Sequence, residues 1–515
     1  MKNTMTRKKT WGILGVILLL GVALRVIGLG NNSFVADEFL DINSSYGYFK
    51  TGEWQSWDFN ESKIAEVNQN AARDERASIY KWQVAQLFSF LPPTEGAARM
   101  VSVVWGGVSI IALFFAGWLF SGKKTVGLIA AFLFSVSISG LEFDRRLRMY
   151  AMFFPIFLLM SMSLFAFYER AYKGKNRFFK YFWEKTELNW VYLVPLLFFG
   201  ALSFWTHQLS VSIIPIFGGY VLWMILASWR KGEAPEDKYA ATAALGLVAT
   251  VVAFSIAPDR VKALLGTLVF FDNHYSYLRY VVRDFAHPLM GAFLFIFGSW
   301  YLLKKTEKKK EALWLLSSSL VPLGMAIWFW RRNEGQQYIF FAQSFMLLLV
   351  SVGAYGVIGF VKDEFSSRWK HAGLAALIAL GVFLPNWGYF FWENNTYHET
   401  SSGTNPNYRK VFAYFKEKRS ADDVLITRNF RNYYWSGEKV RVYDFGGELS
   451  ESKLSVEEVQ SILRDNPRGW FIASGNDMGY VSTEAKRYIE KNMERMSDSR
   501  IRGDILVYRF TQPAP

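Results

Sequence analysis

The segment SGLEFDRRLRMYAMFFPIFLL, residues 139–159, sets a cluster of charged residues between two apolar stretches. The charged residues are Glu142, Asp144, Arg145, Arg146 and Arg148. Ionised side chains are costly inside a bilayer, so such a cluster is expected where a membrane-spanning helix ends. The fold and the function of the chain both depend on which side of the membrane this cluster faces.

Apolar residues dominate the chain well beyond this segment. The 515 residues are 51% hydrophobic and 18% aromatic, and apolar runs of membrane-spanning length recur through residues 1–391. We therefore predict an α-helical polytopic membrane protein with a small soluble C-terminal domain over 392–515. The sequence contains no cysteine, which excludes a disulfide framework and a thiolate metal site.

Eleven apolar segments are predicted to span the membrane. The first follows the basic sequence MKNTMTRKKT and has no small-residue cleavage site, so we expect a retained helix rather than a signal peptide. The predicted spans are 11–30, 98–120, 125–141, 150–167, 190–206, 209–227, 239–257, 288–303, 312–330, 338–361 and 371–391. An odd number of spans puts the two termini on opposite sides.

The distribution of Lys and Arg between short loops predicts the orientation. With a cytoplasmic N-terminus, the cytoplasmic segments carry 23 Lys and Arg residues and the short outer loops carry 9. The predicted cytoplasmic segments are 1–10, 121–124, 168–189, 228–238, 304–311 and 362–370. This bias predicts a cell-membrane protein, plasma or inner, whose C-terminal domain lies outside the cytoplasm.

The arginines of the opening segment then lie on the outer face, against this bias. Four further arginines do the same: Arg279, Arg283, Arg331 and Arg332. Basic residues at helix ends can anchor in lipid headgroups. A guanidinium group also binds phosphate through two parallel hydrogen bonds and stays charged. Headgroup anchoring and an anion site both stay open on these residues alone.

The first outer loop, residues 31–97, carries an acidic pair. Its start, NNSFVADEFLD, places Asp37 and Glu38 a few residues beyond the first span. Adjacent acids in a loop are commonly solvated, but a carboxylate at headgroup level can also deprotonate a hydroxyl group. Arg25 lies within the first span, where a charge generally faces a partner or a cavity unless it snorkels to the surface.

The C-terminal region is polar and nearly neutral. From Trp392 onward it carries 19 Lys and Arg residues and 18 Asp and Glu residues, so the net charge of +14 lies almost wholly in the membrane part. Charge confined to loops between spans argues against a nucleic-acid partner. Helices and strands alternate from NYRKVFAYFKEK to DILVYRF, which predicts a small α/β domain with an open sheet. We expect a structural or acceptor-guiding lid, because the region has no Gly-rich phosphate loop and no nucleophile elbow.

Metal binding has weak support in the sequence. No pair of the five histidines has the spacing of a zinc site. The sequence therefore does not predict a specific cofactor. A divalent cation held by Asp37, Glu38, Glu142 or Asp144 stays open.

Five short motifs, taken in order, resemble the bacterial relatives of protein O-mannosyltransferases and of the aminoarabinose transferase, in the GT-C superfamily of polytopic glycosyltransferases. They are LRVIGLGNNSFVADE, LPPTEGAARMVSVVWGG, GLEFDRRLRMYAM, SFWTHQLS and NEGQQYIFFAQSF. The resemblance is good over most of residues 11–210 and looser elsewhere. It departs at ASIYKW, where the family often has Pro-Pro or His-Pro. It departs again at Gln337, where the family has Arg and where Arg331 and Arg332 are the nearest replacements.

The resemblance implies transfer of a sugar from a polyprenyl-phosphate carrier to a hydroxyl-bearing protein, lipid or glycan on the outer face. It implies that Asp37 is the catalytic base and that Glu38 orients this base, the acceptor or a cation. It also implies that Arg145 and Arg148 hold the donor phosphate. The other residues predicted to bind substrate are Arg25, Glu142, Asp144, Tyr150, His207, Arg279, Arg283, Arg331 and Tyr338.

Other function classes stay open. A transporter or flippase of lipid-linked sugars would also need outer arginines, although not the acidic pair or the soluble domain, and no inverted repeat is evident. A phosphoethanolamine-type transferase would need a metal cluster in the soluble region, where His398 is the only histidine. A structural scaffold is the remaining alternative.

Overall fold

The structure is a computed structural model of the chain. It describes residues 6–35, 37–67, 70–71, 74–259, 261–262, 274–281, 288–329, 335–364, 373, 389, 395, 397, 406–445 and 453–511. The chain divides into two compact units. The first, here the helical unit, comprises Met1–Val26, Ser102–Asp144 and Met149–Trp387, and the second, here the mixed unit, comprises Ile27–Val101, Arg145–Arg148 and Gly388–Pro515. The domain boundary predicted at residue 391 stays a prediction.

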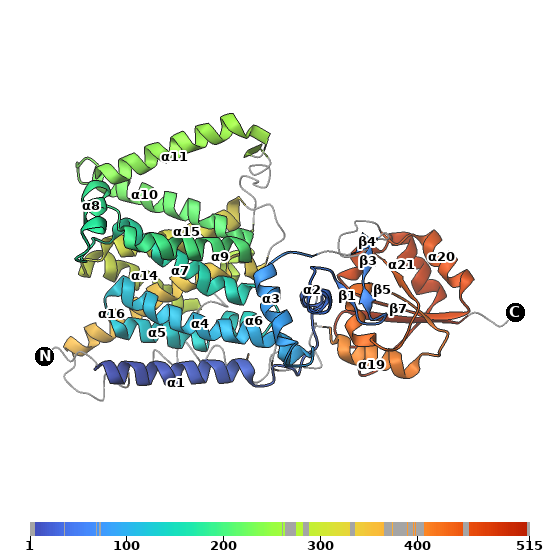
Figure 1. Cartoon of the computed structure of the whole chain (residues 1–515). Helices are drawn as coiled ribbons and strands as arrows, with labels where there is room; N and C mark the ends of the chain where they lie inside the picture. The colour runs from blue at the N-terminus through green and yellow to red at the C-terminus, as the bar shows by residue number, and fades with distance from the viewer. Residues whose placement is uncertain are drawn as a thin grey trace. The chain divides into compact units, whose positions relative to one another are not determined.

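The helical unit consists of helices, most of them long (Figure 1). In lipid every backbone polar group must be paired within its own segment, which selects helices for apolar runs of this length. The helices are α1 (Arg7–Val26), α4 (Glu95–Ser121), α5 (Lys124–Ser135), α6 (Ile138–Asp144), α7 (Tyr150–Glu169), α8 (Arg177–Thr186), α9 (Leu193–Thr206), α10 (Ile213–Trp229), α11 (Asp237–Ile256), α13 (Ser276–Arg279), α14 (Pro288–Lys305), α15 (Lys309–Trp328) and α16 (Gln343–Glu364). Within the described residues of this unit there are four 3-10 turns: η1 (Trp190–Tyr192), η2 (Gln208–Ser212), η4 (Gln336–Tyr338) and η5 (Phe340–Ala342).

Seven of the described helices are long and apolar enough to cross a membrane, and two bent pairs bring the number to nine. The bent pairs are Lys124–Ser135 with Ile138–Asp144, at 62°, and Arg177–Thr186 with Trp190–Thr206, at 107°. A multi-pass membrane architecture is therefore confirmed. The predicted number of eleven membrane spans is not confirmed. Helix α14 covers the predicted span 288–303 but is not among the candidate spans. The predicted span 371–391 lies outside the described residues except at positions 373 and 389.

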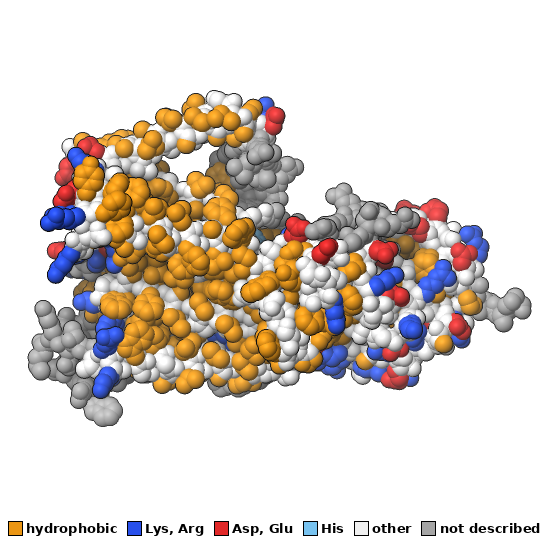
Figure 2. Space-filling view, viewed as in Figure 1, with side chains coloured by type: hydrophobic (Ala, Val, Ile, Leu, Met, Phe, Trp, Pro, Cys, Tyr) orange, Lys and Arg blue, Asp and Glu red, His pale blue; other side chains and the backbone are white. Residues whose placement is uncertain are grey.

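Three of the predicted cytoplasmic segments meet at one end of the helical unit. The carboxylate of Glu169, at the end of α7, lies 3.2 Å from Nζ of Lys238 and 3.0 Å from Nζ of Lys310. These residues belong to segments 168–189, 228–238 and 304–311. Figure 2 shows Lys and Arg side chains gathered at this end of the helices, whose sides are covered by hydrophobic residues. Which side of the membrane this end faces stays a prediction.

The N-terminal part of the mixed unit contains the segment 31–97 that was predicted to be the first outer loop. It contains helices α2 (Glu38–Thr51) and α3 (Ser78–Leu87) and two short hairpins, β1 (Trp57–Asp58) with β2 (Lys63–Ile64) and β3 (Glu66–Val67) with β4 (Asn70–Ala71). Helix α3 has Ala77 at its N-cap position and begins at Ser78. Its inner face buries Tyr80, Lys81, Val84 and Ala85.

The C-terminal part is a small α/β domain, as predicted. It comprises α19 (Tyr408–Lys418), β5 (Val424–Thr427), η7 (Asn429–Trp435), β6 (Val442–Asp444), α20 (Val456–Asp465), β7 (Arg468–Ser474), η8 (Asp477–Tyr480), α21 (Thr483–Asn492), β8 (Glu494–Arg495) and β9 (Ile505–Thr511). The strand order is β6-β5-β7-β9-β8. Strands β6, β5 and β7 are parallel, and β9 is antiparallel to β7 and β8.

Side-chain alternation along β7 explains the layers of this domain. Successive residues of a strand point to opposite faces of the sheet. Phe471 packs in the core that α20 and α21 cover. Its neighbour Trp470 instead contacts the rings of Tyr414 and Phe415 on α19. The sheet is therefore covered by helices on both faces.

Candidate active site

The two residues of the acidic pair have opposite environments. Asp37 occupies the N-cap position of α2 and its side chain is 62% exposed, whereas that of Glu38 is 1% exposed. The carboxylate of Asp37 makes no capping hydrogen bond with the helix. Consecutive residues at a helix start point about 100° apart, which separates the two side chains. Asp37 is thus the member of the pair that solvent can reach.

Glu38 is occupied by four hydrogen bonds. Nε and Nη2 of Arg99 donate to its two oxygens at 2.8 and 2.7 Å, and the backbone amides of Leu147 and Val35 donate at 2.6 and 3.0 Å. Burial disfavours the charged form, but the charge of Arg99 and these hydrogen bonds outweigh it and keep the pKa of Glu38 below its usual value. Glu38 therefore links the backbone at Leu147, next to Arg148, to the backbone at Val35, in the segment 30–38 that is here called the acidic loop.

Arg148 bridges two carboxylates on one face of α2. Its Nη2 lies 3.2 Å from Oδ2 of Asp37, and its Nη1 lies 2.8 Å from Oδ2 of Asp41. Residues four apart in a helix face the same side, which brings the two acids within reach of one guanidinium group. One positive charge thus lies directly beside the exposed carboxylate.

A chain of buried charges continues behind Asp41. Lys81 is fully buried, and its Nζ lies 3.2 Å from a carboxylate oxygen of Asp74 and donates to the backbone carbonyl of Asp74 at 2.6 Å. Burial raises the pKa of Asp41 above its usual value, although Arg148 and Lys81 oppose the shift. Burial also lowers the pKa of Lys81, against the charges of Asp41 and Asp74. These groups hold Arg148 in place from the protein side.

Arg145, the other predicted phosphate ligand, is 2% exposed. Its Nη1 donates to the carbonyl of Ile27 at 2.7 Å, and its guanidinium carbon lies 3.8 Å from the ring centroid of Tyr397. A guanidinium group stacked on an aromatic face is held in a fixed plane. Arg145 is therefore oriented by its surroundings, in the same unit as Asp37 and Arg148.

The structure gives Arg25 a partner within the helical unit. Its Nε lies 2.7 Å from Oδ2 of Asp144, and both side chains are buried. Arg25 also donates to the carbonyls of Gly21, Ser135 and Phe134. Arg25 thus pairs inside the protein and does not snorkel to the surface.

Tyr150 and His207 lie together in the same unit. Their ring centroids are 5.2 Å apart, and both side chains are buried. Nδ1 of His207 accepts a hydrogen bond from the amide of Leu209 at 3.0 Å, which assigns a proton of the neutral ring to Nε2. Their predicted role in binding substrate stays a prediction.

The remaining predicted residues are less informative. Glu142 lies in α6, Arg279 ends α13 with an exposed side chain, and Tyr338 ends η4. Arg283 and Arg331 lie outside the described residues, as does Arg332. Their roles stay predictions.

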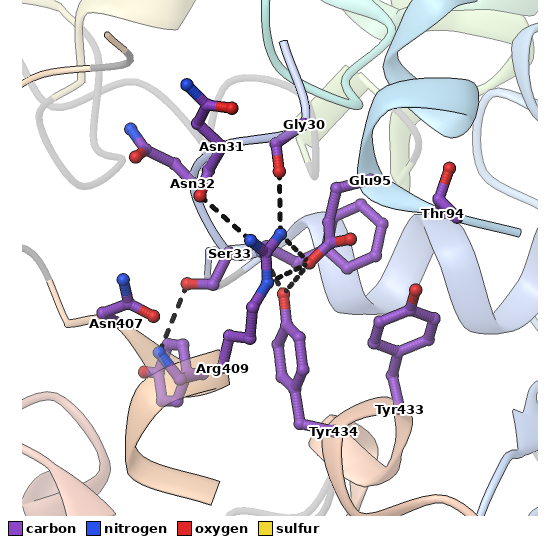
Figure 3. A network of polar contacts seen from close by, with 12 residues as sticks. Gly30, Asn31, Asn32, Ser33, Thr94, Glu95, Asn407, Arg409, Tyr433 and Tyr434 are labelled. Carbon is purple, nitrogen blue, oxygen red and sulfur yellow. Dashed lines mark hydrogen bonds and ion pairs between the residues drawn. The ribbon is translucent and has the colours of Figure 1, made fainter. Parts of the chain in front are cut away.

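A second polar network fixes the backbone just before Asp37 (Figure 3). Arg409, on α19, bonds with the carboxylate of Glu95 and donates to the carbonyls of Gly30 and Asn31 at 2.8 and 3.0 Å. The hydroxyl of Tyr434 donates to Glu95 at 2.8 Å and accepts from the amide of Phe34 at 2.6 Å. The C-terminal domain thus contributes directly to the shape of the acidic loop.

The carboxylates in the described part of the chain do not form a metal-binding group. No cluster of three or more His, Asp or Glu side chains there is arranged to hold a metal ion. Of the predicted cation ligands, Glu38 and Asp144 already have arginine partners. A cation at Asp37 would have to compete with Arg148.

Several residues of this arrangement were missed by the sequence analysis. Arg99 and Asp41 each carried a signal: Arg99 lies inside a motif that matches the family, and Asp41 lies four residues after Asp37. Lys81 is the only charged residue in the apolar segment ASIYKWQVAQLFSFL, which marks it as a side chain that needs a buried partner.

No protein-family model matches the sequence, and no curated protein matches it. Solved structures do share its fold. The AglB oligosaccharyltransferase of Archaeoglobus fulgidus, in complex with an inhibitory peptide and a dolichol-phosphate, superimposes with a TM-score of 0.63 and 11% identity. The match covers 94% of this chain and 72% of AglB. ArnT of Cupriavidus metallidurans, bound to undecaprenyl phosphate, superimposes with a TM-score of 0.54 and 10% identity, over 97% and 98% of the two chains.

At these identities the likeness concerns the fold. Each match covers nearly all of this chain, including both the helical and the mixed unit. The fold predicted from the sequence motifs is therefore confirmed: the chain shares the fold of AglB and ArnT.

Proposed function

We propose that this protein is a glycosyltransferase that moves a sugar from a polyprenyl-phosphate donor to a hydroxyl-bearing acceptor on the outer face of the cell membrane. The observation that carries the proposal is the exposed carboxylate of Asp37 with Arg148 at 3.2 Å. A base and a fixed cation side by side suit a reaction in which a hydroxyl loses a proton while a phosphate leaves. AglB and ArnT, which share the fold, are described with dolichol-phosphate and undecaprenyl phosphate.

The proposed reaction is a direct displacement. The acceptor hydroxyl transfers its proton to Asp37 as its oxygen bonds to the anomeric carbon of the sugar. The bond between that carbon and the phosphate oxygen breaks, and its electron pair leaves with the polyprenyl phosphate. Arg148 and Arg145 stabilise the charge on the departing phosphate. Glu38 acts through Arg99 and the backbone of Leu147, which makes it a positioning residue in this scheme.

The fold favours a transferase over a transporter or flippase, because its structural neighbours carry transferase names. An exposed carboxylate beside Arg148 also has no evident role in moving an anion through a membrane.

The experiment that tests the proposal is transfer by the purified chain from a panel of polyprenyl-phosphate-linked hexoses and pentoses. Mass spectrometry of cell-envelope glycans, with and without the protein, would identify the sugar and the acceptor. Absence of transfer across the panel would favour the flippase.

Arg148 should matter for donor binding more than for folding. Arg148→Ala is expected to weaken donor binding by about 1.5–3 kcal/mol, roughly 10- to 100-fold, because a charge-assisted contact to phosphate is lost. Arg148→Lys should restore only part of this, since lysine lacks the planar fork. Donor titration with both variants measures the effect. Unchanged donor binding by the alanine variant would assign Arg148 to headgroup anchoring.

Transfer should not require an added divalent cation. Arg148 already places a positive charge between Asp37 and Asp41, so we expect the rate in excess EDTA to equal the rate without chelator. The measurement is the initial rate in EDTA, with and without Mg²⁺ or Mn²⁺. Loss of activity in EDTA that either metal restores would show instead that a cation binds at Asp37.

The orientation follows from the loop charges and is tested separately. Because 23 basic residues lie in the predicted cytoplasmic segments and 9 in the short outer loops, we expect the C-terminal domain outside the cytoplasm. An alkaline phosphatase fusion after Thr400 should be active, and a fusion in the segment 228–238 should be inactive. The reverse pattern would contradict both the topology and the proposed site.

A further inference from the structure

A polar cavity of about 590 Å³ lies at the far end of α7 from Tyr150. Its walls come from the end of α7 and the residues after it, from the η1 region, and from the start of α15. Helix α7 runs from Tyr150 to Glu169, roughly 30 Å at 1.5 Å per residue. The cavity is therefore distinct from the Tyr150–His207 pair. It lies where the predicted cytoplasmic segments meet.

The charges around the cavity favour an anionic ligand. Three basic side chains line it, namely Arg170, Lys173 and Lys308, together with two acids, Glu169 and Glu311. Both acids are engaged. Glu169 accepts hydrogen bonds from the hydroxyls of Tyr220 and Tyr239 at 2.8 and 2.7 Å and pairs with Lys238 and Lys310. Glu311 pairs with Lys308 at 2.7 Å. Lys238 and Lys310 also lie 3.9 and 3.5 Å from the carboxylate of Glu236, so this cluster has five basic side chains and three acids.

Asn189 supplies a buried acceptor on the cavity wall. The residue is 5% exposed, and its amide nitrogen donates only a long hydrogen bond, 3.5 Å, to the carbonyl of Ala171. Its Oδ1 is buried and has no hydrogen-bond partner within the described part of the chain. An unsatisfied buried acceptor is unfavourable, so a ligand that brings a hydroxyl group would be stabilised here.

Exposed apolar and aromatic side chains lie beside the cavity. Val191, on its wall, is 43% exposed, and Val194 and Leu197 on the adjoining α9 are 73% and 63% exposed. Helix α8, RFFKYFWEKT, exposes aromatic residues among its basic ones and meets the segment Trp190–Thr206 at 107°. Such a helix suits the membrane interface, with α9 entering the apolar layer. A ligand with an anionic head and acyl chains fits both surfaces.

We propose that this cavity binds an anionic phospholipid whose headgroup carries a hydroxyl group, with the chemistry of phosphatidylglycerol. The phosphodiester lies against Arg170, Lys173 and Lys308, and the glycerol hydroxyl donates to Oδ1 of Asn189. The acyl chains run along the exposed face of α9. This site is independent of the proposed transfer reaction.

The test is native mass spectrometry of the full chain in detergent, titrated with dioleoyl phosphatidylglycerol. Phosphatidylcholine, which has no net charge, tests whether binding requires an anionic headgroup. Phosphatidylmethanol has the same charge as phosphatidylglycerol but no headgroup hydroxyl, so it tests the proposed hydrogen bond to Asn189. We expect phosphatidylglycerol to bind most tightly, phosphatidylmethanol less tightly and phosphatidylcholine most weakly. The double variant Lys173→Gln/Lys308→Gln should bind phosphatidylglycerol about 10- to 100-fold more weakly, since two charge-assisted contacts are removed.

A matched control and a second variant make the result decisive. Lys180→Gln/Lys231→Gln removes two exposed lysines that do not line the cavity, and it should bind like the wild type. Asn189→Ala should abolish the preference for phosphatidylglycerol over phosphatidylmethanol. Equal losses in the two double variants would show nonspecific attraction and overturn the site. Competition by soluble glycerol phosphate at the lipid's own concentration would overturn the lipid assignment. Should a variant fail to fold, the ranking of the three lipids by the wild type decides.

Discussion

Asp37→Asn is expected to slow sugar transfer by roughly 10²–10⁴-fold, the usual contribution of general base catalysis. Asparagine keeps the size of the side chain and one acceptor oxygen, but its amide cannot take the proton of the acceptor hydroxyl. Folding should be unaffected, because the side chain is 62% exposed and makes no capping bond with α2. The measurement is single-turnover transfer from a polyprenyl-phosphate donor by wild type and variant.

The matched control for this variant is Asp422→Asn. Asp422 belongs to the same unit, its side chain is 82% exposed, and it lies on the α/β domain outside the acidic loop. We expect it to transfer sugar at the wild-type rate. The donor should also bind Asp37→Asn almost normally, because Arg145 and Arg148 are retained. Equal transfer rates for wild type and Asp37→Asn would remove Asp37 from the mechanism.

Which residue of the acidic pair is exposed and which is buried depends on where α2 begins. The sequence predicts that residues 37 and 38 matter, because an acidic pair follows a span and matches a family motif. It does not indicate which of the two is exposed. The exposure of each residue depends on two features. Helix α2 starts at Glu38, and Arg99, 61 residues away in the sequence, donates hydrogen bonds to the carboxylate of Glu38. Local patterns predict elements well, whereas they do not identify the partner of a buried charge.

Arg25 illustrates the same limit in the helical unit. A charge within an apolar run predicts a partner, but Asp144 is 119 residues away and nothing in the spacing connects the two. The α/β domain was easier to predict, since its strands and helices have strong periodic patterns. Even there the sequence TEAKRYIEKNME has helix-forming residues over most of its length. Helix α21 instead ends at Asn492, and Glu494–Arg495 pairs with β9. Strand pairing overrode helix propensity at that end.

Glu38→Gln is expected to destabilise the protein by about 3–5 kcal/mol, the range for breaking a buried ion pair by removing one partner. Glu38 and Arg99 are both buried, and the variant leaves the guanidinium group of Arg99 without its counter-charge. Thermal unfolding of the purified chain, followed by circular dichroism, measures the effect. As a control, Glu494→Gln replaces an exposed carboxylate in the same unit and should change stability by less than about 0.5 kcal/mol.

The pH dependence separates this ion pair from a packing defect. Because the pKa of Glu38 is lower in the folded protein than its usual value of 4.5, its contribution is complete above about pH 4.5 and is lost as the pH falls through the lower folded value. The difference in stability between wild type and Glu38→Gln should therefore be constant near neutrality and shrink in acid. A difference that stays the same from pH 7 to pH 3 would attribute the loss to altered packing. The double variant Glu38→Leu/Arg99→Met removes both charges and should recover only part of the lost stability: no unpaired charge remains, but the buried amides of Val35 and Leu147 lose their acceptor.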